Sequence, residues 1–249
     1  MRLLLVNDDG IYAEGLNILA RELEKEYDLT IVAPEEQKSA QSQAITISNP
    51  LIVREVELDG IKSKAYSVSG TPADCVRIAL DKLVDEEVDI VISGINQGLN
   101  AGMDVLYSGT VSAAIEANIY NIPAMALSAE WIDGKIDYEL IARHGMEILN
   151  QTKKDFIENN IILNVNAPYL NGEKVNGIKV CEIGGAIYDY YLEENNSNGD
   201  RVLKLHGRGD GVLEEGTDRY YLSKGYITIT PLHYNLTNFN LLGTVESWF

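Results

Sequence analysis

The stretch Leu3-Leu4-Leu5-Val6-Asn7-Asp8-Asp9-Gly10 decides the fold class of this chain. Its run of aliphatic residues is typical of a strand buried on both faces, as in a parallel sheet covered by helices. The run stops at two carboxylates, and the carboxyl ends of such strands are where ligands bind in open α/β sheets. Adjacent carboxylates repel each other and are costly to desolvate, so Asp8 and Asp9 indicate a divalent cation. A simple strand-to-helix turn with one aspartate as a helix cap is an equally good interpretation of these residues by themselves.

The residues after this stretch complete a βαβ unit. Apolar residues recur at helical spacing between Ala13 and Glu26, and Leu29 to Ala33 forms a second apolar run that Pro34 ends. Alternating residues at 45–56 and 61–68 predict two strands, a buried strand is expected at 88–93 and a short one at 124–128, and helices are expected after Thr71-Pro72 and at 138–149. We therefore predict an α/β fold, a Rossmann-like three-layer sandwich with a mainly parallel sheet. Neither a dinucleotide-binding glycine fingerprint nor a P-loop occurs in the sequence.

The sequence changes character after about residue 150. Short apolar runs at residues 161–165, 178–183, 186–192 and 201–205 predict strands, and the polar residues 193–200 predict an exposed hairpin tip. We expect one domain over residues 1–249, with an α/β core at 1–150 that carries the metal site. The C-terminal part, 151–249, is expected to supply β-hairpin arms for oligomerisation.

Composition restricts the partners and the compartment. The chain has 38 acidic and 20 basic residues and a net charge of −18, which argues against polymeric nucleic acid as a partner. No apolar run approaches the roughly 18 residues of a membrane span, so no membrane partner is expected. Cys75 and Cys181 are too few and too far apart for a disulfide framework. These features predict a cytoplasmic protein.

Two polar residues follow other strands of the predicted sheet. Ser39 lies beyond the end of the second strand, and Asn96 follows the strand at residues 88–93. Because parallel strands end at one edge of the sheet, both are expected near Asp8 and Asp9. A serine in such a loop is more often a local cap, so its position relative to the aspartates is what singles it out.

A glycine-rich loop leads from Asn96 to the helix that begins at Ser108, Gly109 and Thr110. A helix start offers unpaired N–H groups and the positive end of the helix dipole, so these three residues are predicted to bind phosphate. If Thr110 were only a helix cap, the glycines at positions 94, 98, 102 and 109 would remain unexplained.

Taken together, the motifs and their order resemble the SurE family of stationary-phase survival proteins. The matching motifs are Val6 to Gly10, Ala33-Pro34 with Ser39 downstream, Gly70 to Val76, Ser93 to Asn100, Ser108 to Ala114, Asn164 to Pro168 and Gly225 to Leu232. They cover almost the whole chain. Two positions depart from the family pattern: Ala44 stands where the family often has serine, and residues 195–199 are too variable to align.

The resemblance implies one divalent cation per subunit, Mg²⁺ or Mn²⁺, held by Asp8, Asp9, Ser39 and Asn96. Among these, Asp8, Asp9 and Asn96 are the expected catalytic residues. Hard oxygen ligands of this kind suit those two metals better than zinc or copper. The implied activity is that of a metal-dependent phosphomonoesterase, a 5′(3′)-nucleotidase that cleaves nucleoside monophosphates and short polyphosphate. The implied assembly is a homodimer or homotetramer built through the C-terminal arms.

Two other functions compete with this one. An aspartyl-phosphate phosphatase also uses carboxylates after a strand, but such sites need Asp-x-Asp, and the tandem pair Asp8-Asp9 fits poorly. A non-catalytic nucleotide sensor would use the same metal loop only for binding. Release of phosphate by the pure protein separates the enzyme from the sensor.

Overall fold

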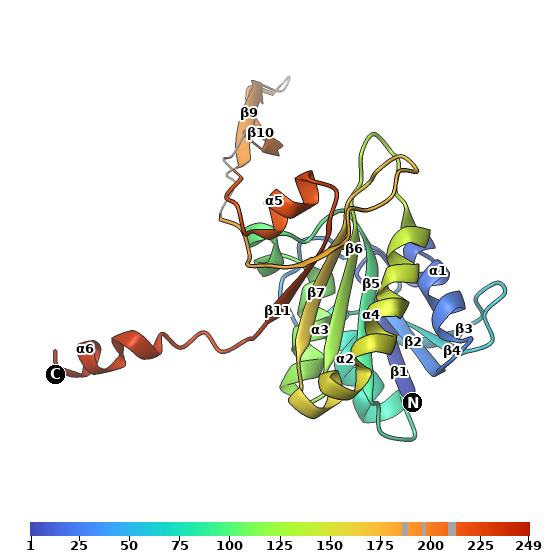
Figure 1. Cartoon of the computed structure of the whole chain (residues 1–249). Helices are drawn as coiled ribbons and strands as arrows, with labels where there is room; N and C mark the ends of the chain where they lie inside the picture. Colours follow the sequence, from blue (N-terminus) through green and yellow to red (C-terminus); the bar gives the residue numbers. More distant parts are fainter. Residues whose placement is uncertain (186–188, 196–197, 209–212) are drawn as a thin grey trace.

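The protein is described here by a computed structural model, which covers residues 1–185, 189–195, 198–208 and 213–249. A nine-stranded sheet with the order β3-β4-β2-β1-β5-β6-β7-β11-β8 forms its centre (Figure 1). The strands are β1 (Arg2–Val6), β2 (Asp28–Pro34), β3 (Val53–Val56), β4 (Lys64–Val68), β5 (Ile90–Gln97), β6 (Ala124–Ala129), β7 (Ile162–Ala167), β8 (Ile178–Val180) and β11 (Ile227–Leu232).

The middle of the sheet is parallel. Strand β1 pairs in parallel with β2 on one side and β5 on the other, so that Leu5 lies opposite Ile31 and Ile92. Strands β4, β6 and β7 continue the parallel arrangement, whereas β3 against β4 and β11 against β7 are antiparallel. The carboxyl ends of β1, β2 and β5 therefore lie side by side at one edge of the sheet.

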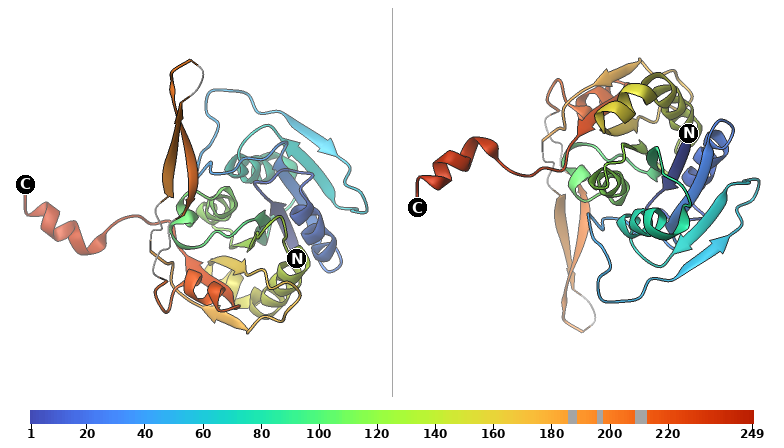
Figure 2. Two further views of the ribbon diagram at one scale, coloured as in Figure 1. Left: turned by 90° about the horizontal axis from the view of Figure 1, so that it is seen from above. Right: turned by 90° about the horizontal axis from the view of Figure 1, so that it is seen from below.

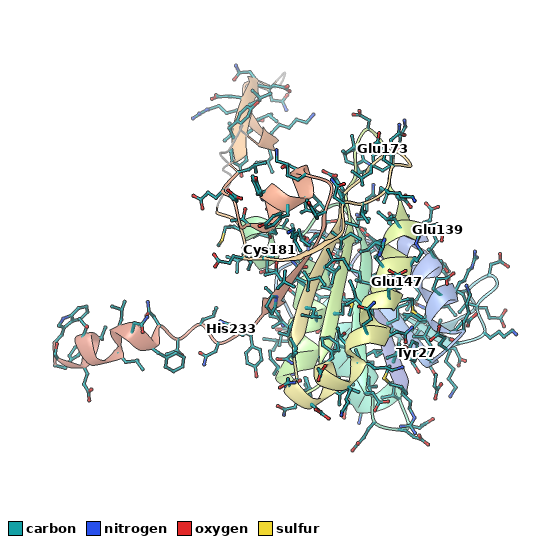
Figure 3. The ribbon with its side chains drawn as sticks, in the orientation of Figure 1. Tyr27, Glu139, Glu147, Glu173, Cys181 and His233 are labelled. Atoms are coloured by element: carbon teal, nitrogen blue, oxygen red, sulfur yellow. The ribbon has the colours of Figure 1, made fainter. Side chains whose placement is uncertain are left out.

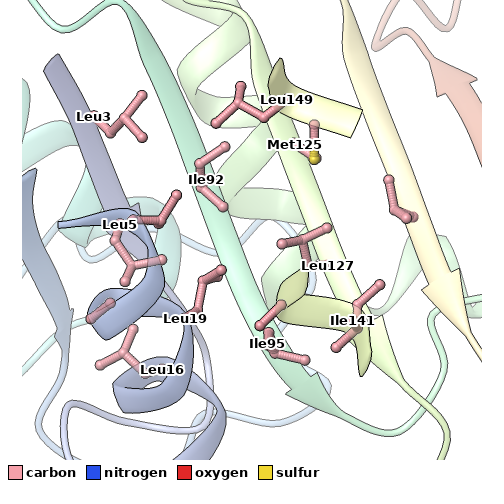
Figure 4. Close-up of a cluster of buried hydrophobic side chains, with 14 of the residues drawn as sticks. Leu3, Leu5, Leu16, Leu19, Ile92, Ile95, Met125, Leu127, Ile141 and Leu149 are labelled. Carbon is pink, nitrogen blue, oxygen red and sulfur yellow. The ribbon is translucent and has the colours of Figure 1, made fainter. Parts of the chain in front are cut away.

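Helices cover both faces of the sheet, which confirms the predicted three-layer sandwich. They are α1 (Glu14–Leu23), α2 (Pro72–Ile78), α3 (Gly109–Ile119) and α4 (Tyr138–Asn159), with the shorter α5 (Asp218–Ser223) and α6 (Leu242–Glu246) near the C-terminus. Leu16 and Leu19 of α1 and Ile141 of α4 belong to one buried cluster against the sheet (Figure 4). On the opposite face, Val76 of α2 and Val111 of α3 form a second cluster. The apolar runs read from the sequence thus form two cores, one on each side.

Several elements differ in extent from the sequence-based expectation. Helix α4 continues to Asn159 instead of ending near residue 149, and β5 continues to Gln97 instead of ending near residue 93, so that Asn96 lies within the strand. Strand β3 begins only at Val53 although alternation starts at Ile45. The polar groups of Thr46 explain the late start of β3. The backbone N–H of Thr46 donates to Asp74 Oδ1 at 3.0 Å, and its hydroxyl donates to Oδ2 at 2.7 Å. A carboxylate at the start of α2 thereby takes the place of a neighbouring strand as the partner of this segment.

An arm and a tail extend from the body. Strands β9 (Asp189–Asn195) and β10 (Arg201–Arg208) form a separate antiparallel sheet that projects outward (Figures 1 and 2), which confirms the predicted hairpin arm. The predicted tip at 193–200 begins later, because β9 runs to Asn195. Residues 186–188 of the predicted strand and 196–197 of the tip lie outside the described residues.

The tail was not expected from the sequence. From His233 onward the chain leaves the sheet and ends in α6, away from the body (Figure 3). Across the described residues, none of the helices combines the length and apolar character that crossing a membrane requires. The domain division at residue 150 stays a prediction.

Candidate active site

The turn after β1 is closed by Asn7, a fully buried side chain that sequence reasoning did not assign a role. Its amide nitrogen donates to the carbonyl of Gly10 at 2.9 Å, and the N–H of Gly10 donates to Asn7 Oδ1 at 3.2 Å. Gly10 has a φ of +103°, a conformation that favours glycine. The closed turn presents Asp8 and Asp9 at the edge of the sheet. An asparagine three residues before a glycine is the sequence signal that points to such a turn.

Asp8 is a buried carboxylate whose charge is poorly compensated by the protein. Its side chain is 5% exposed. Burial raises the pKa of Asp8 to about 6; a hydrogen bond from Thr110 opposes this increase, and the neighbouring charge of Asp9 adds to it. The Thr110 hydroxyl donates to Asp8 Oδ1 at 2.5 Å. A cation beside Asp8 would remove the cost of keeping this buried group ionised.

The start of α3 packs directly on Asp8. A Cβ atom placed on Gly109 would lie 2.8 Å from Asp8 Cβ and 3.0 Å from its Oδ2. Only glycine allows this approach, because Cβ contacts under 3.0 Å essentially do not occur. Ser108 caps the helix, since the N–H of Val111 donates to its Oγ at 3.0 Å. The structure thus brings Gly109 and Thr110 to Asp8, with Ser108 as the helix cap.

Asp9 ties two further loops to the turn. Its Oδ2 accepts the backbone N–H of Gln97 at 2.9 Å, and its Oδ1 accepts the side-chain amide of Gln37 at 3.0 Å. Sequence reasoning missed both glutamines. They lie 28 and 88 residues from Asp9 along the chain, and no local pattern marks either of them.

Ser39 and Asn96 are carried by these same loops. The backbone N–H of Lys38 donates to the carbonyl of Asp8 at 2.7 Å, which places Ser39 next to the turn. Asn96 lies near the end of β5, and its amide nitrogen donates to the carbonyl of Gly98 at 2.7 Å. That bond leaves Oδ1 of Asn96 as the atom for binding a cation. The four predicted ligands therefore come from three loops at one edge of the sheet.

The donor set fits a hard divalent cation. Two carboxylates, a hydroxyl and an amide carbonyl offer only oxygen, which suits Mg²⁺ or Mn²⁺. Within the described part of the chain, no group of three or more His, Cys, Asp or Glu side chains is placed to hold a metal ion. With Asp8 and Asp9 as the two acids, the remaining ligands must be neutral oxygens, as is usual for magnesium sites that keep several water ligands.

The loop that carries Ser39 is fastened to the segment before α3. The hydroxyl of Ser42 donates to the carbonyl of Leu106 at 2.6 Å, and its N–H donates to the carbonyl of Tyr107 at 3.0 Å. The carbonyl of Ala44 accepts the Thr71 hydroxyl at 2.7 Å, which joins the same loop to the start of α2. The two bonds of Ser42 thus connect the loop that carries Ser39 to the segment that leads to the predicted phosphate-binding residues.

Known proteins resemble this chain over its full length. A 5′-nucleotidase SurE of Clostridium botulinum (strain Loch Maree / Type A3) is 51% identical over 251 residues, covering 100% of this chain and 99% of the relative. A 5′-nucleotidase SurE of Clostridium tetani is 49% identical, covering 100% of both chains. The crystal structure of the SurE protein from Aquifex aeolicus superposes with a TM-score of 0.87 at 34% identity, covering 100% of this chain and 99% of that one. The family model for survival protein SurE matches residues 3–190, and this chain therefore belongs to the SurE family.

Proposed function

We propose that this protein is a metal-dependent phosphomonoesterase, a 5′(3′)-nucleotidase that hydrolyses nucleoside monophosphates to nucleoside and phosphate. Short polyphosphate is proposed as a further substrate. Full-length relatives from two Clostridium species carry the name 5′-nucleotidase. The observation that carries the proposal is the contact of buried Asp8 with the start of α3, because a carboxylate suited to a cation then lies beside a helix N-terminus suited to phosphate.

The reaction needs a water molecule to attack phosphorus. The water oxygen forms a new bond to phosphorus, the ester P–O bond breaks, and the departing alcohol oxygen takes up a proton. When bound, a divalent cation neutralises charge on the phosphoryl group and lowers the pKa of water. Asp8, Asp9, Ser39 and Asn96 would hold it. The N–H groups of the first turn of α3, at Gly109 and Thr110, orient the phosphoryl oxygens.

Phosphate release from a panel of nucleoside monophosphates tests the activity and its metal requirement together. With Mn²⁺ the pure protein is expected to release phosphate from 5′ and 3′ esters, and chelation is expected to lower the rate about tenfold or more, because the anionic ester then lacks charge neutralisation. Added Mn²⁺ restores the rate. A protein that binds nucleotide with Mn²⁺ but releases no phosphate is a sensor, and phosphate trapped covalently on the protein during turnover would establish an aspartyl-phosphate route.

We further propose that the protein is a homodimer or homotetramer that buries the tail of each subunit on another copy. The tail beyond β11 carries large apolar side chains that solvent surrounds in the single chain. Leu236 is 90% exposed, Phe239 65% and Trp248 70%. A concentration of exposed apolar residues on one segment marks a contact surface, and the projecting tail (Figure 2) has the reach to lie on a second subunit.

Replacing Leu236 and Phe239 together with aspartate is expected to convert the oligomer to monomer, because burying two carboxylates at an apolar interface is costly. Sedimentation velocity measures the change. The matched control is Asn240→Asp, which adds a charge at an exposed position of the same segment without removing an apolar side chain. If wild type is itself a monomer at micromolar concentration, the assembly proposal is wrong.

A further inference from the structure

Asp218 holds the loop that precedes α3. This side chain has no exposed surface. Its Oδ2 accepts the backbone N–H of Gly102 at 2.7 Å, and its Oδ1 accepts the N–H of Gly184 at 2.9 Å. The start of α5 is thereby joined to a loop more than a hundred residues earlier in the chain. Such buried charge-assisted hydrogen bonds are strong and directional.

Arg219, the next residue in the chain, also contacts the 101–104 loop. Its Nη2 donates to the carbonyl of Ala101 and to Asp104 Oδ2, both at 2.7 Å. The two ends of the ion pair are only 18% and 24% exposed, for Arg219 and Asp104 respectively. A Cβ on Gly102, whose φ is +60°, would lie 2.5 Å from Arg219 Nε, so the guanidinium packs closely against this backbone.

The backbone of Asp104 connects the Arg219 contact to the start of α3. The carbonyl of Asp104 accepts the N–H of Ser108, the cap of α3, at 3.1 Å. The next two residues, Gly109 and Thr110, are those that contact Asp8. A continuous path of hydrogen bonds and close packing therefore runs from Arg219 to the carboxylate at the end of β1.

Asp218 also contacts a residue on the other side of the β9–β10 arm in the chain. The backbone N–H of Asp218 donates to the carbonyl of Glu182 at 2.9 Å, and a bridge pairs Glu182 with Thr217. Glu182 precedes the arm in the chain and Asp218 follows it, so this contact closes the arm's base. Glu182, Asp218 and the 101–104 loop, which are far apart in the chain, therefore meet in one cluster.

We infer that Arg219 is a positioning residue for phosphate ester hydrolysis: through Asp104 it sets where the start of α3 lies relative to Asp8. Asp218 accepts the backbone N–H of Arg219 and that of Gly102, both at 2.7 Å, and so fixes Arg219 against the 101–104 loop. The inference rests on the proposed nucleotidase function, and it concerns turnover, because α3 contributes donors to the reacting phosphoryl group.

The test compares Arg219→Gln with Arg2→Gln. Arg2 has the same combination of partners, a backbone carbonyl at Glu87 and a carboxylate at Glu86, but it lies at the opposite edge of the sheet. Arg219→Gln is expected to lower kcat about tenfold, with KM changed less than about threefold, because a small misplacement of the donors affects the transition state more than binding. Arg2→Gln is expected to leave both values unchanged.

Two further variants separate positioning from a general loss of structure. Arg219→Lys keeps the charge and a single nitrogen that can donate to both acceptors, as Nη2 does, but it loses the planar guanidinium that packs against Gly102, so it is expected to restore part of kcat. Asp104→Asn is expected to lower kcat as well, and its combination with Arg219→Gln is expected to cost less than the sum of the two, because both remove the ion pair between Arg219 and Asp104. Circular dichroism and the Tm of each variant give the folded fraction. A decrease in kcat that matches the unfolded fraction overturns the inference, as does equality of Arg219→Gln and Arg2→Gln.

Titration of Mn²⁺ into each folded variant by calorimetry supplies a readout that does not need turnover. Displacement of α3 from Asp8 is expected to weaken Mn²⁺ binding about threefold or more in Arg219→Gln but not in Arg2→Gln. If wild type releases no phosphate, the proposed function fails. The Mn²⁺ titration then still decides whether Arg219 positions Asp8, and equal affinity in the two variants refutes it.

Discussion

Replacing Asp8 with asparagine is expected to lower the rate of phosphate release on the order of a thousandfold, because the substitution removes a cation ligand of the proposed site. Asparagine has nearly the same shape as aspartate. Its Oδ1 can still accept the Thr110 hydroxyl, which bonds Asp8 at 2.5 Å, so the packing of α3 is preserved. The decrease in rate then reports the loss of one negative charge at this position. Initial rates of phosphate release at saturating Mn²⁺ measure it.

The same substitution is expected to stabilise the metal-free protein. Asp8 is buried beside Asp9, and its neutral counterpart avoids both the desolvation cost and the repulsion. We expect the free energy of unfolding to increase by roughly 1–2 kcal/mol, within the range common for single stabilising substitutions. Urea unfolding in the presence of chelator measures it.

Asp59→Asn is the control, since Asp59 is an exposed carboxylate on the turn between β3 and β4. It is expected to change neither the rate nor the stability. An Asp8→Asn protein that keeps wild-type turnover would remove Asp8 from the metal site. One that is inactive but less stable than wild type would show that the carboxylate has a structural role in addition.

Replacing Gly109 with alanine is expected to lower the rate about a hundredfold, because the new methyl group would lie 2.8 Å from Asp8 Cβ and must displace either the carboxylate or the helix start. The neighbouring atoms belong to a short side chain fixed by Thr110, so the crowding cannot be relieved at the far end of a flexible group. Initial rates and Mn²⁺ affinity both report the displacement.

Gly145→Ala is the matched control for this substitution. Gly145 also lies in a helix, and a Cβ there would lie 2.9 Å from Leu127 Cδ1, a methyl group in the core on the other face of the sheet. Gly145→Ala is expected to lower the Tm without lowering kcat of the folded fraction. If Gly109→Ala reduces stability and retains full kcat, the start of α3 does not position the reacting groups.

The sequence was sufficient to predict the parallel sheet and that the candidate ligands gather at one edge of it. Buried parallel strands need apolar residues on both faces, so β1, β2, β5 and β6 appear as predominantly apolar runs, although β5 continues four residues beyond its predicted end at residue 93. The limits of other elements were less well predicted. Residues 45–52 alternate like a strand, but the contact between Thr46 and Asp74 replaces strand pairing there, and nothing local indicates it.

By itself, the sequence determined that Asp8, Asp9, Ser39 and Asn96 lie at or beyond the carboxyl ends of strands of one parallel sheet, and this suffices to bring them to a common edge, because all such strands end on the same side. Only the tertiary structure decided which groups hold them there. Thr110 contacts Asp8 across 102 residues, and Arg219 contacts Asp104 across 115. Hydrogen bonds of this kind require donor and acceptor to be placed to within a fraction of an ångström, which depends on how the helices and strands pack. The spacing of apolar residues along the chain does not specify that placement.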